Sequence, residues 1–182
     1  MPKIDALRRF LLPALLVLLL AVWLGGGVTH DDTSIDEWLQ LLALPLLAVA
    51  AVVLLAEFPE DRYRRFGIAI AVLVATVPLL QLLPIPVAGW NLPPARDALA
   101  ADLGQAGVAS FPRHWSLAPH ASEVALWTLM PALAAFLGAM ALEVGHRRRL
   151  VQGIVLLVLV NVAFAFFQTG LPLGSNLRLY QE

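Results

Sequence analysis

The sequence contains no cysteine, which excludes disulfides, thiol catalysis and thiolate metal sites. Charged residues are scarce too: they make up 14% of the chain, against about a quarter in soluble domains. The net charge of −1 gives no general attraction to nucleic acid, so we expect no nucleic-acid partner. The chain has no P-loop, no dinucleotide fingerprint and no Ser-His-Asp order, and we expect no cofactor.

Hydrophobic residues are abundant instead, at 60% of the chain. One globular core of this size cannot bury them all, so a lipid-facing surface is expected. Crossing a bilayer takes about 20 apolar residues as a helix, and five segments qualify without a charge in their interior or the alternation of barrel strands. The expected spans cover about 10–28, 38–56, 66–83, 123–142 and 150–167. The predicted fold is all-α, a polytopic membrane protein with a single integral-membrane domain over residues 1–182.

The first span has a basic start followed by an apolar run, as a signal peptide has. The run ends in Trp23-Leu24-Gly25-Gly26-Gly27, without a small-x-small cleavage site. Because four more spans follow, we expect this span to stay uncleaved.

Basic residues alternate between the loops and thereby predict an orientation. Nine of the twelve lie before span one, between spans two and three, and between spans four and five: Lys3, Arg8, Arg9, Arg62, Arg64, Arg65, Arg147, Arg148 and Arg149. The other loops and the tail contain only three basic residues, Arg96, Arg113 and Arg178. The positive-inside rule therefore predicts a cytoplasmic N-terminus and an outer C-terminus.

The segment 84–122 is then the longest outer loop. Pro93-Pro94 can begin a short helix that ends near Gly104 or Gly107. Leu99 and Leu103 share one face of it, which predicts an amphipathic helix on the outer surface. The fourth span begins either with Pro119 in its first turn or with Ser122 as its cap.

The outer loop also holds the candidate binding residues. All five tryptophans lie near predicted outer ends, where indole rings anchor in the headgroup layer: Trp23, Trp38, Trp90, Trp115 and Trp127. Stacking on a glycan is the alternative role for Trp90 and Trp115. Arg113 can bind a phosphate bidentately, and headgroup contact or a loop ion pair is its alternative. His114 and His120 lack a third ligand, so we expect no metal site.

Polar and small residues inside the spans suggest helix contacts. Asn161 and Gln168 are seven apart and share a face, which suits hydrogen bonding to another helix or, alternatively, a substrate or ion path. Ala134, Gly138 and Gly145 form a small-residue stripe suited to close packing. Pro45, Pro78 and Pro131 fall in the outer half of their spans, where kinks could open a cavity; proline is also simply frequent in membrane helices.

Several segments together resemble the N-terminal half of bacterial O-antigen ligases and O-antigen polymerase-like membrane proteins. They occur in the same order: LQLLPIPVAGW (Leu80 to Trp90), WSLAPHAS (Trp115 to Ser122), LWTLMPALAAF (Leu126 to Phe136), HRRRL (His146 to Leu150) and FQTGLPLGSNLRLY (Phe167 to Tyr180). The resemblance covers about residues 60–182. It departs at Ala118, where such proteins often have a polar helix cap.

The resemblance implies an inner-membrane protein of envelope polysaccharide or lipopolysaccharide assembly, which takes glycans from a polyprenyl-diphosphate carrier without a metal. The family's catalytic residues lie in a later half that this sequence does not contain, so no catalytic residue can be assigned and we expect no activity from this chain alone. Arg113 and Arg178 become candidate diphosphate contacts. A second chain supplying the missing half would be a partner. The alternatives are a non-enzymatic scaffold or regulatory subunit, and part of a carrier, which the lack of charge inside the spans disfavours.

Overall fold

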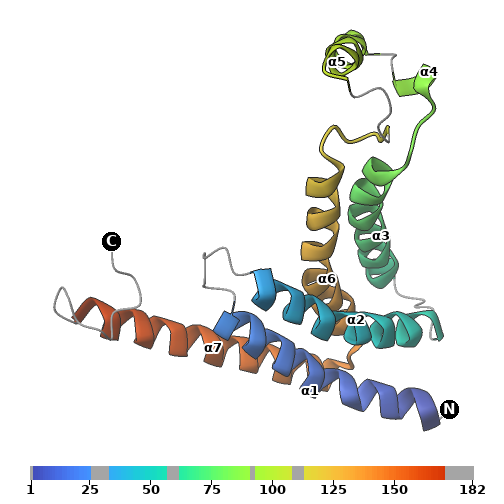
Figure 1. The fold of residues 1–182 in the computed structure, drawn as a ribbon. Helices are drawn as coiled ribbons and strands as arrows, with labels where there is room; N and C mark the ends of the chain where they lie inside the picture. Colours follow the sequence, from blue (N-terminus) through green and yellow to red (C-terminus); the bar gives the residue numbers. More distant parts are fainter. Residues whose placement is uncertain (1, 26–32, 57–61, 91–92, 108–112, 171–182) are drawn as a thin grey trace. The chain divides into compact units, whose positions relative to one another are not determined.

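The computed structural model describes residues 2–25, 33–56, 62–90, 93–107 and 113–170. They form helices α1 (Pro2–Gly25), α2 (Thr33–Ala56), α3 (Arg62–Leu82), α4 (Val87–Trp90), α5 (Pro94–Gln105), α6 (Pro119–Ala141) and α7 (Val144–Gly170) (Figure 1). These described residues contain no strand, only an isolated antiparallel bridge between Pro84 and His114. Five helices, α1, α2, α3, α6 and α7, are long and apolar enough to cross a membrane. The all-helical, multi-pass architecture is therefore confirmed.

The helices extend beyond the apolar runs because intrahelical hydrogen bonds do not require apolar side chains. Thus α7 starts at Val144, and its first turns contain the basic residues that precede the apolar run. Helix α6 starts at Pro119, and the Ser122 amide already donates to the Ala118 carbonyl at 3.2 Å. Of the two predicted starts, Pro119 in the first turn is correct and the capping role of Ser122 is wrong.

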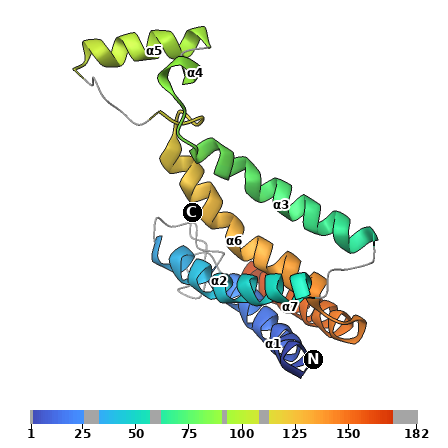
Figure 2. The same ribbon diagram turned by 90° about the vertical axis from the view of Figure 1, so that its right-hand side faces the viewer.

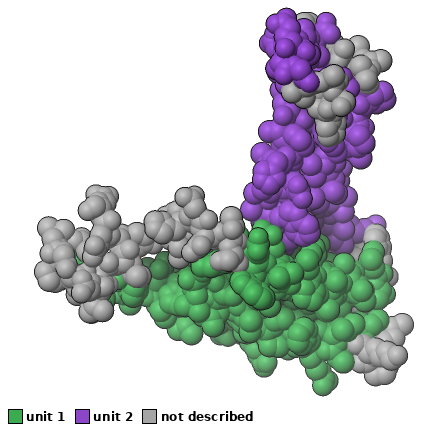
Figure 3. Space-filling model, in the orientation of Figure 1, with its two compact units in different colours: residues 1–58, 133–182 green, residues 59–132 purple. Residues whose placement is uncertain are grey.

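The chain divides into two compact units, each described here by itself (Figure 3). The first unit comprises residues 1–58 and 133–182, and the second comprises residues 59–132. Helix α6 contributes to both. The expectation of one integral-membrane domain stays a prediction.

In the first unit, α1 packs against α2 and α7. A Cβ atom built on Gly138 would lie 2.9 Å from Leu15 of α1, and one on Gly153 of α7 would lie 2.7 Å from Leu16. Close approach of this kind stabilises membrane helices, where the hydrophobic effect contributes little. Ala134 and Gly138 are buried, as the small-residue stripe predicts, whereas Gly145 is exposed and has no neighbour within 4 Å of its Cβ position.

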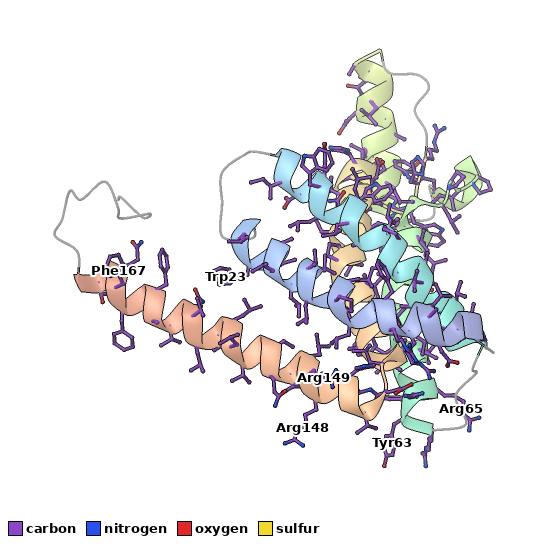
Figure 4. All side chains as sticks on the ribbon, turned by 90° about the horizontal axis from the view of Figure 1, so that it is seen from below. Trp23, Tyr63, Arg65, Arg148, Arg149 and Phe167 are labelled. Carbon is purple, nitrogen blue, oxygen red and sulfur yellow. The ribbon has the colours of Figure 1, made fainter. Side chains whose placement is uncertain are left out.

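Charged and aromatic side chains mark opposite ends of the first unit. Arg148 and Arg149 lie at the start of α7, whereas Trp23 and Phe167 lie toward the other ends of α1 and α7 (Figure 4). At the basic end, Arg8 of α1 forms an ion pair with Glu143 at 3.3 Å. Such segregation is typical of a helical unit that spans a bilayer.

Helix α7 makes little contact with the rest of its unit beyond its first turns. Leu150 is its buried residue. Asn161 is exposed and Gln168 is half-buried. Hydrogen bonding of these amides to another helix therefore stays a prediction.

In the second unit, α3 and the first part of α6 lie close together near α4 and separate farther along (Figure 2). Helix α5 begins as predicted at Pro94, directly after Pro93. It continues through Gly104 and ends at Gln105, and Gly107 follows with a φ of 82°, a conformation that glycine adopts without strain. The short helix α4 is not predicted from the sequence.

Candidate functional site

Two segments of the second unit pair side by side at the end of α3. The Ser116 amide donates to the Gln81 carbonyl at 2.9 Å, and the Ile85 amide donates to the Arg113 carbonyl at 2.9 Å. Between these bonds, the His114 ring donates through Nδ1 to the Leu82 carbonyl at 2.8 Å, which assigns the proton to that nitrogen. The paired segment, residues 81–85 with residues 113–116, fixes the backbone of Arg113.

The guanidinium groups of Arg96 and Arg113 both lie over the indole ring of Trp90, next to this paired segment. The Cζ atoms of Arg96 and Arg113 lie 5.7 Å and 5.9 Å from the centroid of the Trp90 ring, close enough for cation–π attraction. Arg96 also donates through Nη2 to the Trp115 carbonyl. We call Trp90, Arg96 and Arg113 the cation cluster. Its two positive charges around a single ring are a suitable arrangement for an anion.

Each member of the cluster is positioned by a different element. Trp90 is the last residue of α4, Arg96 lies in the first turn of α5, and Arg113 belongs to the paired segment. Sequence reasoning included Arg113 and Trp90 but missed Arg96; the only signal for Arg96 was its place in that first turn.

The tryptophan candidates differ in accessibility. Trp90 is 2% exposed, so its ring offers no face to a sugar in this arrangement, whereas Trp115 is 56% exposed. Glycan stacking therefore stays a prediction, and of the two rings only that of Trp115 is exposed. Arg178 lies outside the described residues.

A polar contact ties α3 to the start of α6. The Ser122 hydroxyl lies 3.1 Å from Gln81 Oε1 and 2.8 Å from the Ser116 hydroxyl. Ser122 is 7% exposed, so these bonds satisfy a buried group. The Ser116 hydroxyl accepts a hydrogen bond from the Ala118 amide at 3.1 Å, directly before the first residue of α6.

A groove of about 470 Å³ runs between α3 and α6 below this contact. It is lined by Val74, Val77, Pro78, Gln81, Ala125, Thr128 and Leu129. The lining is mostly apolar, with Gln81 at the end nearest the cation cluster. Because Pro78 has no amide hydrogen, it cannot donate to the Val74 carbonyl and interrupts the α3 hydrogen-bond ladder. Of the prolines whose kinks could open a cavity, Pro78 lines this groove, whereas Pro131 does not.

The histidines in the described ranges show no metal-binding arrangement. His120 and Glu123 lie 3.9 Å apart with both side chains exposed. Across the described ranges, no three or more His, Cys, Asp or Glu side chains are grouped to hold a metal ion.

No family model matches the sequence, and no similar protein was found among characterised proteins or solved structures. The resemblance to O-antigen ligases and polymerases therefore rests on the sequence motifs alone.

Proposed function

We propose that this protein binds the diphosphate of a polyprenyl-diphosphate-linked glycan on the periplasmic side of a bacterial inner membrane. It would serve an O-antigen ligase or polymerase-like assembly of envelope polysaccharide or lipopolysaccharide. The observation that carries the proposal is the cation cluster, in which Arg96 and Arg113 both lie over Trp90. The sequence motifs give the class of lipid.

The chemistry of the cluster suits a diphosphate. A guanidinium binds phosphate oxygens through two parallel N–H bonds, which a single ammonium cannot do. Stacking on Trp90 restrains both arginines, so less conformational freedom is lost when a ligand binds. The paired segment further restrains the backbone of Arg113.

The cluster supplies binding groups, and no catalytic residue is assigned to this chain. Under this proposal the protein binds the carrier lipid and presents it for glycan transfer. A non-enzymatic scaffold or regulatory subunit is the second candidate, favoured by the same observation, because two cations and an indole can bind an anionic lipid without performing chemistry on it.

Calorimetric titration of inorganic pyrophosphate into the protein in phosphatidylcholine nanodiscs tests the proposal. We expect saturable binding, weakened about tenfold by Arg96→Gln and by Arg113→Gln, because each removes a charge-assisted hydrogen bond. Arg62→Gln, at the exposed start of α3, is the matched control and should leave the affinity unchanged. Absence of binding to the wild-type protein, or equal losses in all three variants, would contradict the proposal.

A further inference from the structure

Helices α1 and α7 begin at the same end of the first unit. Arg8 of α1 forms its ion pair with Glu143, which directly precedes α7. Farther along both helices, Leu16 of α1 lies against Gly153 of α7. Because the two contacts follow in the same order along both helices, α1 and α7 run parallel (Figure 1). The basic first turns of the two helices are therefore neighbours.

Three arginines of these first turns are accessible to a ligand. Arg9, Arg148 and Arg149 are all exposed, and none of them forms an ion pair with a carboxylate in the described part of the chain. We call these three residues the basic patch. Asp5, exposed one turn before Arg9, offsets part of their charge, and the patch stays positive.

The basic patch borders the apolar surface of the same two helices. Phe10 follows Arg9 and is 58% exposed, and Val151 follows shortly after Arg149 and is 57% exposed. In a bilayer such apolar side chains lie in the hydrocarbon, and guanidinium groups next to them reach the headgroup layer. The phosphates of phospholipids lie at this level, whereas a soluble partner would approach only from the water beyond it.

We propose that an anionic phospholipid binds here, with its headgroup phosphate between the starts of α1 and α7 and held by Arg9, Arg148 and Arg149. Guanidinium groups bind phosphate oxygens through paired N–H bonds, and basic sites between membrane helices suit acidic headgroups. Such a lipid would join α1 and α7 at the end where Arg8 and Glu143 already hold them together.

This site is independent of the proposed function. The basic patch belongs to the first unit, whereas all three residues of the cation cluster belong to the second. The charge of the headgroup decides which phospholipid binds to the patch. Phosphatidylcholine carries a quaternary ammonium that the arginines repel, whereas the phosphate of phosphatidylglycerol is its only charge. Each arginine near the membrane surface is expected to favour the acidic lipid about fivefold.

Native mass spectrometry of the protein in neutral detergent tests the site. The protein is mixed with equal amounts of phosphatidylglycerol and phosphatidylcholine with the same acyl chains, and the bound lipids are counted. We expect one phosphatidylglycerol to bind about tenfold more tightly than phosphatidylcholine. The combined substitution Arg9→Gln, Arg148→Gln and Arg149→Gln should weaken phosphatidylglycerol binding about a hundredfold, and each single substitution about fivefold. Phosphatidylglycerol should also raise the thermal midpoint of the wild type more than that of the combined variant.

A matched control removes the same charge from the first turn of α3. The combined substitution Arg62→Gln, Arg64→Gln and Arg65→Gln should leave phosphatidylglycerol binding unchanged. Equal losses in the two combined variants would show diffuse attraction by charge and overturn the inference. Equal binding of the two lipids would overturn it too, as would displacement of phosphatidylglycerol by an equal concentration of inorganic phosphate.

Two further comparisons keep the test decisive. If the combined variant of the basic patch does not fold, the three single substitutions at exposed positions decide the same question. If pyrophosphate does not bind to the protein, the proposed function fails while the inference stands, provided that phosphatidylglycerol binding depends on the basic patch. If pyrophosphate binds but phosphatidylglycerol is not preferred, the inference fails and the proposed function stands.

Discussion

At the scale of single residues, arginine side chains in this protein have two different roles. Arg147 donates through Nε to the Leu142 carbonyl at 2.9 Å and through Nη2 to the Met140 carbonyl at 2.8 Å. Carbonyls at a helix C-terminus lack helical donors, and a cation there also suits the helix dipole. Arg147 therefore stabilises the turn between α6 and α7, whereas Arg96 and Arg113 are held around an indole.

Replacing Arg147 by methionine keeps much of the side-chain length but removes both hydrogen bonds. We expect Arg147→Met to lower the free energy of unfolding by about 1–3 kcal/mol, because two partly buried carbonyls lose a charged donor. Thermal unfolding in detergent measures the change. The control is Arg148→Met, one residue along and exposed, which should have an effect of less than about 0.5 kcal/mol. Equal effects of the two substitutions would show that Arg147 acts only through its charge.

At the scale of elements, Leu15 of α1 packs closely against α6 residues of the first unit because Gly138 has no side chain. The Leu15 atoms Cγ, Cδ1 and Cδ2 all lie within 3.3 Å of the Cβ position of Gly138, and Leu15 is 1% exposed. All three outer atoms of the Leu15 side chain lie near this Cβ position, and the side chain is buried among other residues. A rotamer change of Leu15 therefore cannot relieve the clash with a side chain at position 138.

Substitution at Gly138 should therefore separate these helices. We expect Gly138→Val to destabilise the protein by about 1–3 kcal/mol, the usual cost of overpacking. Leu15→Ala in the same chain should restore part of this loss, which a double-mutant cycle measures. Gly145→Ala, at a position with open space, should leave the unfolding midpoint unchanged. A Gly138→Val protein as stable as wild type would refute the packing account.

The elements also show what the sequence can and cannot predict. The five long helices follow from hydropathy, and the start of α5 follows from Pro93 and Pro94, because both signals are local. Helix α4 is a single short turn of 4 residues, which leaves no periodic pattern in the sequence. The paired segment of residues 81–85 with 113–116 is not predictable either, since its hydrogen bonds join residues far apart in the sequence. For the same reason Arg113 was recognised from its own chemistry, but its neighbours Trp90 and Arg96 could be assembled only from the structure.

At the scale of the whole molecule, the account requires that the cation cluster face the outside of the membrane. The distribution of basic residues predicts this orientation, and the five membrane-spanning helices agree with it in number. The Arg148 end of α7 would then face the cytoplasm. A carrier lipid that presents its glycan outside could reach Arg96 and Arg113 only in this orientation.

Cysteine labelling in intact spheroplasts tests this central claim most directly, because the natural chain has no cysteine and gives no background. Leu117→Cys and Arg148→Cys each add one thiol at an exposed position, the first beside the paired segment and the second in α7. A membrane-impermeant maleimide is applied before and after lysis. The account predicts that Leu117→Cys is labelled before lysis and Arg148→Cys only afterwards. The reverse pattern would place the cation cluster in the cytoplasm and contradict the proposed function.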